Sequence, residues 1–259
     1  MTNMPWIMNN DIRYSVRIKN GAGWRAYDTV RLMISVGAPY HEGMKFAALV
    51  DWLNRSANIK HVIVSVNDTL QRYNLIAGGV NDRAAKIVAL AEGAMWLARV
   101  QDSLSDLKKP YSISRWNEWI DRPDFPQHMQ LIGRQAESNP DFTSAIMQDI
   151  EGIISRWKAR GIVIGNEAAF REQSINYIKE ESAVFNMMTL DCDAAEIYPG
   201  SELASALYFN TNPVIPGLEG LAKRYFTRID FARLKAGDKN AANDQAALLA
   251  STAETTLRA

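Results

Sequence analysis

Two short apolar segments, separated by one segment of helical length, constrain the fold of this chain more than any other feature. Residues 29–36 read Thr-Val-Arg-Leu-Met-Ile-Ser-Val and end at Gly37, and residues 61–66 read His-Val-Ile-Val-Ser-Val. Runs of this kind, rich in β-branched side chains and closed by a turn, are typical of buried strands. The segment between them repeats apolar residues at helical spacing, at Met44, Ala47, Ala48, Val50 and Leu53. Strand, helix and strand in this order predict a βαβ unit, and therefore a parallel sheet.

Further elements are expected along the rest of the chain. Apolar residues recur at helical spacing between Asn81 and Leu104, and Asn139-Pro140-Asp141 is a favourable start for a helix that Gly161 ends. A helix over residues 167–180 and a strand near residues 225–231 complete the set. The predicted fold class is α/β, with a single domain over residues 1–236. Residues 237–259 contain no aromatic side chain and are expected to form a poorly packed tail.

Composition excludes several classes of protein. Of 259 residues, 47% are hydrophobic, which is enough to fill a core, so a mainly disordered chain is excluded. No run of about 18 uncharged apolar residues occurs, and the first residues lack the pattern of a secretory signal. We therefore expect a cytoplasmic protein with no membrane partner. One cysteine, Cys192, and three histidines disfavour disulfides and metal sites. Lys plus Arg equals Asp plus Glu at 29 each, so no DNA partner is expected and any surface for RNA must be local.

Ser35 is the first candidate for chemistry, because it lies where the first predicted strand ends before a helix. Side chains at such a place can be exposed above the sheet edge, near a helix N-terminus. The alternative is that Ser35 only caps the turn. His41 is the histidine nearest to it in sequence, but Met33-Ile34-Ser35-Val36-Gly37 is not the Gly-x-Ser-x-Gly elbow of hydrolases. A hydrolase triad is therefore disfavoured.

Tyr177 and Glu181 form a second candidate site, since a spacing of four places a phenol and a carboxylate on one face of a helix. Together they can hold an ammonium group. The alternative is an accidental pair on a surface helix, with Glu180 as a solvated neighbour. Asp191-Cys192-Asp193 is interpreted as an acidic turn rather than a metal site, and the sequence has no glycine-rich phosphate loop.

Three signatures in sequence order resemble those of the tRNA-dependent cyclodipeptide synthases, over roughly residues 25–232. The first is an apolar strand leading into Ser35, with a loop to Tyr40 and a following helix that carries Trp52. The second is Tyr177-Ile-Lys-Glu-Glu181, and the third is Tyr198-Pro199.

The same signatures also place the chain within that family and show where it departs from it. Ala38 together with Tyr198-Pro199 resembles the subgroup with Tyr-Pro, rather than Tyr-His, in the third motif. The chain departs from the family at Met33, where glycine is usual, and at Thr29, where histidine is common. It also lacks the proline that usually follows the second signature.

The resemblance implies a Rossmann-like domain with a mainly parallel sheet flanked by helices, similar to the catalytic domains of tyrosyl- and tryptophanyl-tRNA synthetases. It implies an enzyme that makes a 2,5-diketopiperazine from two aminoacyl-tRNAs by a ping-pong route, through an aminoacyl-Ser35 and a dipeptidyl-enzyme. No cofactor is implied, because the aminoacyl ester already carries the activation energy.

The resemblance also implies roles for individual residues. Glu181 and Tyr177 would hold the amino group, Tyr198 would relay a proton, and backbone N–H groups of residues 33–37 would stabilise the oxyanion. The implied substrate-binding residues are Met33, Gly37, Ala38, Ser65, Asn67 and Pro199.

Arg31 offers a prediction about the substrate. Strand alternation places Arg31, Met33 and Ser35 on one face, so the guanidinium is expected to line the pocket for the first amino acid. A buried guanidinium needs a carboxylate or polar partner, which predicts an acidic or polar substrate. The open alternative is an internal ion pair from Arg31 to an Asp or Glu of the protein.

Binding of tRNA requires local clusters of cations. The candidates are Arg13, Arg17, Lys19 and Arg25, then Arg99, Lys108 and Lys109, and finally the densest group, Lys223, Arg224, Arg228, Arg233 and Lys235. The expected partners are two aminoacyl-tRNAs, bound by a monomer. Two other functions stay open at this point: an aminoacyl transferase that hands the acyl group from Ser35 to a small amine, and a non-catalytic tRNA-binding module.

Overall fold

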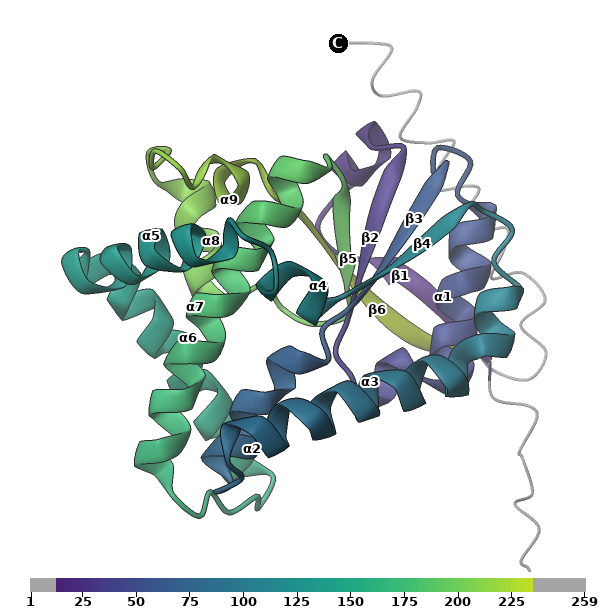
Figure 1. Ribbon diagram of the computed structural model, residues 1–259. Coiled ribbons are helices and arrows are strands. Elements are labelled where there is room, and N and C mark those ends of the chain that lie inside the picture. The colour runs from purple at the N-terminus through teal and green to yellow at the C-terminus, as the bar shows by residue number, and fades with distance from the viewer. Residues whose placement is uncertain (1–12, 235–259) are drawn as a thin grey trace, which may run out of the picture.

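The computed structural model describes residues 13–234, and its centre is a six-stranded sheet with strand order β1-β6-β5-β2-β3-β4 (Figure 1). The strands are β1 (Arg13–Ile18), β2 (Thr29–Ile34), β3 (His61–Val66), β4 (Tyr111–Arg115), β5 (Ala195–Tyr198) and β6 (Tyr225–Leu234). Every neighbouring pair is parallel except β1 and β6, which are antiparallel. The predicted α/β fold with a mainly parallel sheet is therefore confirmed, whereas the tail at residues 237–259 lies outside the described residues.

Helices cover both faces of the sheet (Figure 1). One core joins β2 and β3 to the helices α1 (Gly43–Arg55) and α3 (Asp82–Ser105), through side chains such as Leu32, Phe46 and Trp96. The second core joins Met33, on the other face of β2, to the remaining larger helices. These are α5 (Phe125–Ser138), α6 (Pro140–Ala159), α7 (Glu167–Asp191) and α8 (Ala204–Thr211), with the shorter α2 (Arg72–Ala77), α4 (Trp116–Ile120) and α9 (Glu219–Lys223).

The register of β2 and β3 positions the site. Met33 pairs with Ser65 and Ile34 with Val66, so that both strands end at the same level. Since carboxyl ends of parallel strands meet at one sheet edge, Ser35 and Asn67 lie side by side just beyond them, and the Asn67 N–H donates to the carbonyl of Ile34 at 2.9 Å. The end of β5 places Tyr198 at this same edge.

Several predicted elements are found as expected, and others differ. The strand at residues 61–66 and the helix that begins at Pro140 are confirmed. The helix predicted to end at residue 180 continues to Asp191, because residues 182–189 are buried against the sheet and nothing before Cys192 breaks the helix. Strands β1 and β4 were not predicted, since both are edge strands with few buried side chains. Among the described residues, no helix combines the length and hydropathy that crossing a membrane requires.

Candidate active site

Ser35 is held by a tight loop that returns to it through His41. Gly37, at φ +82°, lets the chain reverse, after which Ala38 N–H donates to the Ser35 carbonyl at 3.1 Å. The Ser35 N–H donates to His41 Nδ1 at 3.0 Å. His41 is buried, and burial lowers its pKa to about 3, so the ring is neutral and accepts this hydrogen bond. His41 therefore positions the backbone of Ser35. Of the N–H groups of residues 33–37 that were expected to stabilise an oxyanion, the Ser35 N–H is already occupied by this hydrogen bond.

Tyr198 joins Ser35 at the strand ends. Its hydroxyl lies 3.0 Å from Ser35 Oγ and 2.8 Å from the hydroxyl of Tyr40. Burial raises the pKa of the Tyr198 phenol, so its anion is strongly disfavoured. The structure thus brings together Ser35 and Tyr198, which are 163 residues apart in sequence, and adds Tyr40.

A cavity of about 900 Å³ opens in front of these hydroxyls. It lies between the strand ends on one side and α6 and α7 on the other, with the loop after β5 and the start of β6 closing it. The predicted site residues that line it are Met33, Ser35, Asn67, Tyr177, Glu181, Tyr198, Arg224 and Arg228. Its volume is within the range of small-molecule sites.

Tyr177 and Glu181 face this cavity from α7. The Tyr177 hydroxyl accepts a hydrogen bond from Gln71 Nε2 at 3.4 Å. Burial raises the pKa of the Glu181 carboxyl to about 8, and the nearby Arg224 guanidinium opposes that rise. A cation bound beside Glu181 would favour its charged form, so the pair is suited to an ammonium ligand.

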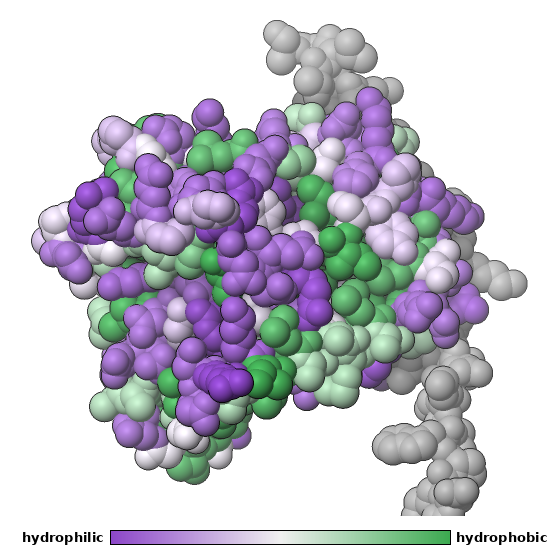
Figure 2. Space-filling model, in the orientation of Figure 1, coloured by the Kyte–Doolittle hydropathy of each residue, from purple (hydrophilic) through white to green (hydrophobic). Residues whose placement is uncertain are grey.

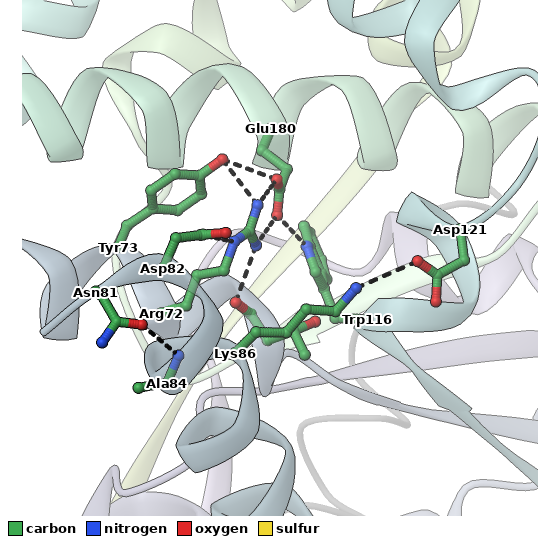
Figure 3. Close-up of polar contacts among 10 residues, drawn as sticks. Arg72, Tyr73, Asn81, Asp82, Ala84, Lys86, Trp116, Asp121 and Glu180 are labelled. Carbon is green, nitrogen blue, oxygen red and sulfur yellow. Dashed lines mark hydrogen bonds and ion pairs between the residues drawn. The ribbon is translucent and has the colours of Figure 1, made fainter.

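Glu180, on a different face of α7, belongs to a buried polar cluster rather than to solvent. Its side chain is 2% exposed and accepts hydrogen bonds from Arg72 Nη1 at 2.7 Å, from the Tyr73 hydroxyl at 2.8 Å and from Trp116 Nε1 at 2.9 Å (Figure 3). The interpretation of Glu180 as a solvated neighbour was wrong. The cluster ties α2 and α4 to α7, next to the turn that presents Tyr177 and Glu181.

Arg31 does not line the cavity. Its buried guanidinium donates to the carbonyl of Met188 at 2.8 Å, and its Nη1 lies 3.9 Å from Glu196 Oε1. Alternation places Arg31 on the correct face of β2, but four residues of strand, about 13 Å, separate it from Ser35. The C-terminal end of α7 packs over this part of β2 and contacts Arg31 through the carbonyl of Met188. The expected contact between Arg31 and substrate is therefore wrong, and the alternative, an internal ion pair, is found.

The other predicted substrate-binding residues fall into two groups. Met33 and Asn67 line the cavity, and Asn67, only 4% exposed, has a buried Oδ1 with no hydrogen-bond partner among residues 13–234. Four others are not among the lining residues: Gly37 and Ala38, which build the loop, Ser65, whose Oγ lies 3.9 Å from Met188 Sδ, and Pro199.

Arg224 was not predicted to line the cavity, but it does. It was expected on the surface as a contact for tRNA, yet it is buried, with Nε 2.5 Å from Glu196 Oε2 and Nη1 3.1 Å from Glu202 Oε1. Its guanidinium also lies 4.6 Å from the ring centroid of Phe185. Arg224 is therefore a charged wall of the cavity, and its two carboxylate partners hold it there.

Solved structures share this arrangement of elements. The structure of a CDPS (cyclodipeptide synthase) from Fluoribacter dumoffii matches with a TM-score of 0.76 at 24% identity, over 86% of this chain and 100% of that chain. The cyclodipeptide synthase from Candidatus Glomeribacter gigasporarum, bound to Phe-tRNAPhe, matches with a TM-score of 0.59 at 20% identity, over 82% and 89%. The chain has the cyclodipeptide synthase fold. Neither a protein-family model nor a curated protein sequence matches it.

A third structure connects this fold to a larger class. A Mycobacterium tuberculosis protein, whose structure is described as relating cyclodipeptide synthetases to type I tRNA synthetases, matches with a TM-score of 0.61 at 14% identity, over 84% of this chain and 93% of that chain. The similarity to tRNA synthetase catalytic domains expected from the sequence agrees with this relationship.

On this cyclodipeptide synthase fold, the expected cations are dispersed. Arg13, Arg17, Arg228 and Arg233 are exposed on the antiparallel pair β1 and β6, where Lys19 pairs with Asp230 at 3.1 Å. Arg25, Lys108 and Lys223 are exposed and Lys109 is half-buried, while Lys235 lies outside the described residues.

The surface over α3 and β4 is apolar rather than basic. Arg99 pairs with Glu42 at 2.7 Å. Large apolar side chains are exposed on α3 and β4, and apolar surface is visible over these two elements in Figure 2. Two exposed cations that sequence reasoning missed, Arg156 on α6 and Arg160 directly after it, line the cavity together with Arg228. Their spacing of four is the only sequence signal for them. Among residues 13–234, no group of three or more His, Cys, Asp or Glu is arranged to hold a metal ion.

Proposed function

We propose that this protein is a cyclodipeptide synthase that uses two aminoacyl-tRNAs in turn. The observation that carries the proposal is the placement of the Ser35 hydroxyl, 3.0 Å from Tyr198, in a cavity that also contains Tyr177 and Glu181. That arrangement offers a nucleophile, a proton-transfer group and a binding place for an ammonium group within one cavity. The fold supports the proposal, because the similar structures are cyclodipeptide synthases.

The first half-reaction acylates Ser35. The Ser35 oxygen attacks the carbonyl carbon of the aminoacyl ester, the bond to the tRNA 3′ oxygen breaks, and the serine proton leaves through Tyr198 toward that oxygen. Glu181 and Tyr177 hold the amino group of the acyl-enzyme. This grip is specific to the charged amine, since a cation beside Glu181 stabilises the carboxylate against its burial.

The second half-reaction builds and releases the ring. The amine of the second aminoacyl-tRNA attacks the acyl-Ser35 carbonyl, the bond from that carbon to Ser35 Oγ breaks, and a proton from the amine passes to Oγ, which gives a dipeptidyl-tRNA and a free Ser35 hydroxyl. Ser35 Oγ then attacks the ester carbonyl of the dipeptidyl-tRNA, the bond to the tRNA 3′ oxygen breaks, and the serine proton passes to that oxygen, which gives the dipeptidyl-enzyme and free tRNA. The free amine of the dipeptidyl-enzyme then attacks its own ester carbonyl. The bond to Ser35 Oγ breaks, the serine recovers a proton by way of Tyr198, and a 2,5-diketopiperazine leaves.

We propose that one of the two amino acids has a polar side chain. The residue of the protein that would recognise this side chain is Asn67, in place of Arg31. Asn67 lies beside Ser35 at the sheet edge, and its buried Oδ1 has no partner within the described residues. A buried amide oxygen without a hydrogen bond is costly, so a ligand that donates to it gains affinity over an apolar one. Arg31 takes no part in this selection.

The tRNA would be held by phosphate contacts around the cavity mouth. Arg228 lines the cavity from β6, Arg156 lines it from α6 and Arg160 lines it from the residue after that helix; all three are exposed. Contacts of this kind read no base, so affinity should depend strongly on salt. We propose that the protein acts as a monomer in the cytoplasm, with no DNA or membrane partner and no cofactor.

The decisive experiment compares the native protein with Ser35→Ala. Purified protein is mixed with aminoacyl-tRNA, intact protein masses are recorded within seconds, and the medium of expressing bacteria is searched for cyclodipeptides. The proposal expects an aminoacyl adduct on the native protein and cyclic dipeptides in the medium, both abolished in Ser35→Ala. An adduct that releases product only when a small amine is added would identify a transferase. No adduct, with tRNA binding unchanged in Ser35→Ala, would identify a non-catalytic tRNA-binding module.

A further inference from the structure

The Tyr198 hydroxyl lies between two other hydroxyls, and only one of them has a place in the cycle described above. Ser35 Oγ is 3.0 Å away on one side, and the Tyr40 hydroxyl is 2.8 Å away on the other. Tyr40 lines the same cavity. We propose that Tyr40 is a further catalytic residue, which delivers to the departing tRNA the proton that Tyr198 takes up from Ser35; this inference rests on the proposed function.

Counting protons in the row of three hydroxyls leads to this role. Each hydroxyl has one proton, so two hydrogen bonds within the row use two protons, and the third proton points out at one end. When Ser35 attacks, its proton must point toward Tyr198. The Tyr198 proton then points toward Tyr40, and the Tyr40 proton is the one presented to the cavity.

The environment of Tyr198 favours a transfer in which a second hydroxyl takes part. Its phenol is buried, and burial raises its pKa, as does the neighbouring Tyr40 hydroxyl. A tyrosinate at this position would therefore be costly. If Tyr198 accepts the serine proton and gives its own to Tyr40 in one step, no anion forms there.

Tyr40 is held rigidly enough for this task. Its ring meets the His41 ring edge-on at 4.7 Å between centroids and the Tyr198 ring edge-on at 5.9 Å. His41 in turn is fixed by the Ser35 N–H at 3.0 Å and, through its carbonyl, by Trp96 Nε1 at 3.0 Å. Both ends of the row of hydroxyls therefore belong to one braced loop, which preserves the spacing that proton transfer needs.

The step balances without any other reactant. The bond from Ser35 Oγ to the acyl carbon forms and the bond from that carbon to the tRNA 3′ oxygen breaks, with its electron pair passing to the oxygen. Ser35 gives a proton to Tyr198, Tyr198 gives one to Tyr40, and Tyr40 gives one to the 3′ oxygen. On cyclisation the relay runs in reverse, from the attacking amine through Tyr40 and Tyr198 to Ser35.

The test uses Tyr40→Phe, which removes the hydroxyl and keeps the ring contacts, with Tyr111→Phe on the exposed strand β4 as the matched control. Single-turnover acylation of Ser35 by aminoacyl-tRNA is followed by intact mass, alongside the Kd for that tRNA. We expect acylation to fall by about 10²-fold in Tyr40→Phe with Kd changed less than twofold, and no change in Tyr111→Phe. In mixtures of H2O and D2O, a plot of the wild-type acylation rate against the deuterium fraction should be curved, because several protons move in the same step. The same plot for Tyr40→Phe should lose that curvature.

A double variant separates relay from packing. If the two tyrosines act in series, Tyr40→Phe combined with Tyr198→Phe should be no slower than Tyr198→Phe alone. Additive losses, or a Tyr40→Phe rate equal to the wild-type rate, overturn the relay while leaving the acyl-enzyme route intact. If wild-type protein forms no adduct on Ser35, the proposed function and the relay both fail.

Discussion

Replacing Glu180 by glutamine tests whether the buried cluster beneath α7 holds the active-site helix in place. Glu180 is 2% exposed and receives hydrogen bonds from Arg72, Tyr73 and Trp116. Glutamine keeps the size of the side chain but removes its charge. The Arg72 guanidinium, whose side chain is only 12% exposed, then loses its ion pair with Glu180. Breaking a buried pair on one side costs about 3–5 kcal/mol, and the amide oxygen that remains recovers part of that.

We therefore expect Glu180→Gln to lose about 3 kcal/mol of unfolding free energy. For a domain of this size, that corresponds to a Tm lower by about 6–12 °C. Thermal unfolding followed by circular dichroism, with urea unfolding as a second measure, determines both quantities. The matched control is Glu172→Gln, an exposed residue of the same helix, which should stay within about 0.5 kcal/mol of the wild type.

The reasoning also predicts the behaviour of a double variant. Replacing Glu180 and Arg72 together by apolar residues of similar size removes both charges, so the pair Glu180→Leu with Arg72→Met should be less destabilised than the sum of the single changes. A Tm for Glu180→Gln equal to that of Glu172→Gln would refute the account, because it would mean that the ion pair and its three donors contribute nothing to holding α7.

Three further predictions concern the cavity. Burial raises the pKa of Glu181 to about 8 from 4.5, so the folded protein keeps this proton to a higher pH than the unfolded chain does. The unfolding free energy of the wild type should therefore fall by up to about 5 kcal/mol as the pH rises from 4.5 through 8. Urea unfolding at pH 5, 7 and 9 should show this loss in the wild type and not in Glu181→Gln. Asn67→Leu, which keeps the branching of the side chain and replaces the amide by methyl groups, should shift the cyclodipeptides detected by mass spectrometry toward apolar side chains, whereas an unchanged product set would remove Asn67 from substrate selection. Arg228→Gln should weaken aminoacyl-tRNA binding and flatten the plot of log Kd against log salt concentration by about one, with Arg55→Gln on α1 as the control; an unaltered slope would exclude a phosphate contact at Arg228.

Local pattern alone determined the central architecture of this protein. Apolar β-branched runs at residues 29–36 and 61–66, with an amphipathic segment between them, leave few choices other than a βαβ unit, because only a parallel sheet buries both faces of such strands. The same local logic identified the start of α6, where Asn139 caps the helix through hydrogen bonds to the N–H groups of Asp141 and Phe142. It placed Ser35 at a strand end, and the spacing of Tyr177 and Glu181 placed both on one side of α7.

What the arginines do was decided only by the tertiary structure. Arg31, Arg224 and Arg228 read alike in sequence, yet one closes an internal ion pair, one is a buried wall of the cavity and one is exposed at its mouth. The difference depends on which carboxylates arrive from other elements, Glu196 from β5 and Glu202 from the loop after it. Periodicity describes which face of an element a side chain occupies, but it does not describe how far along that face the neighbouring helix extends. The row from Ser35 through Tyr198 to Tyr40 has the same origin, since contacts between residues 163 positions apart exist only once the parallel strands have brought their ends to one edge.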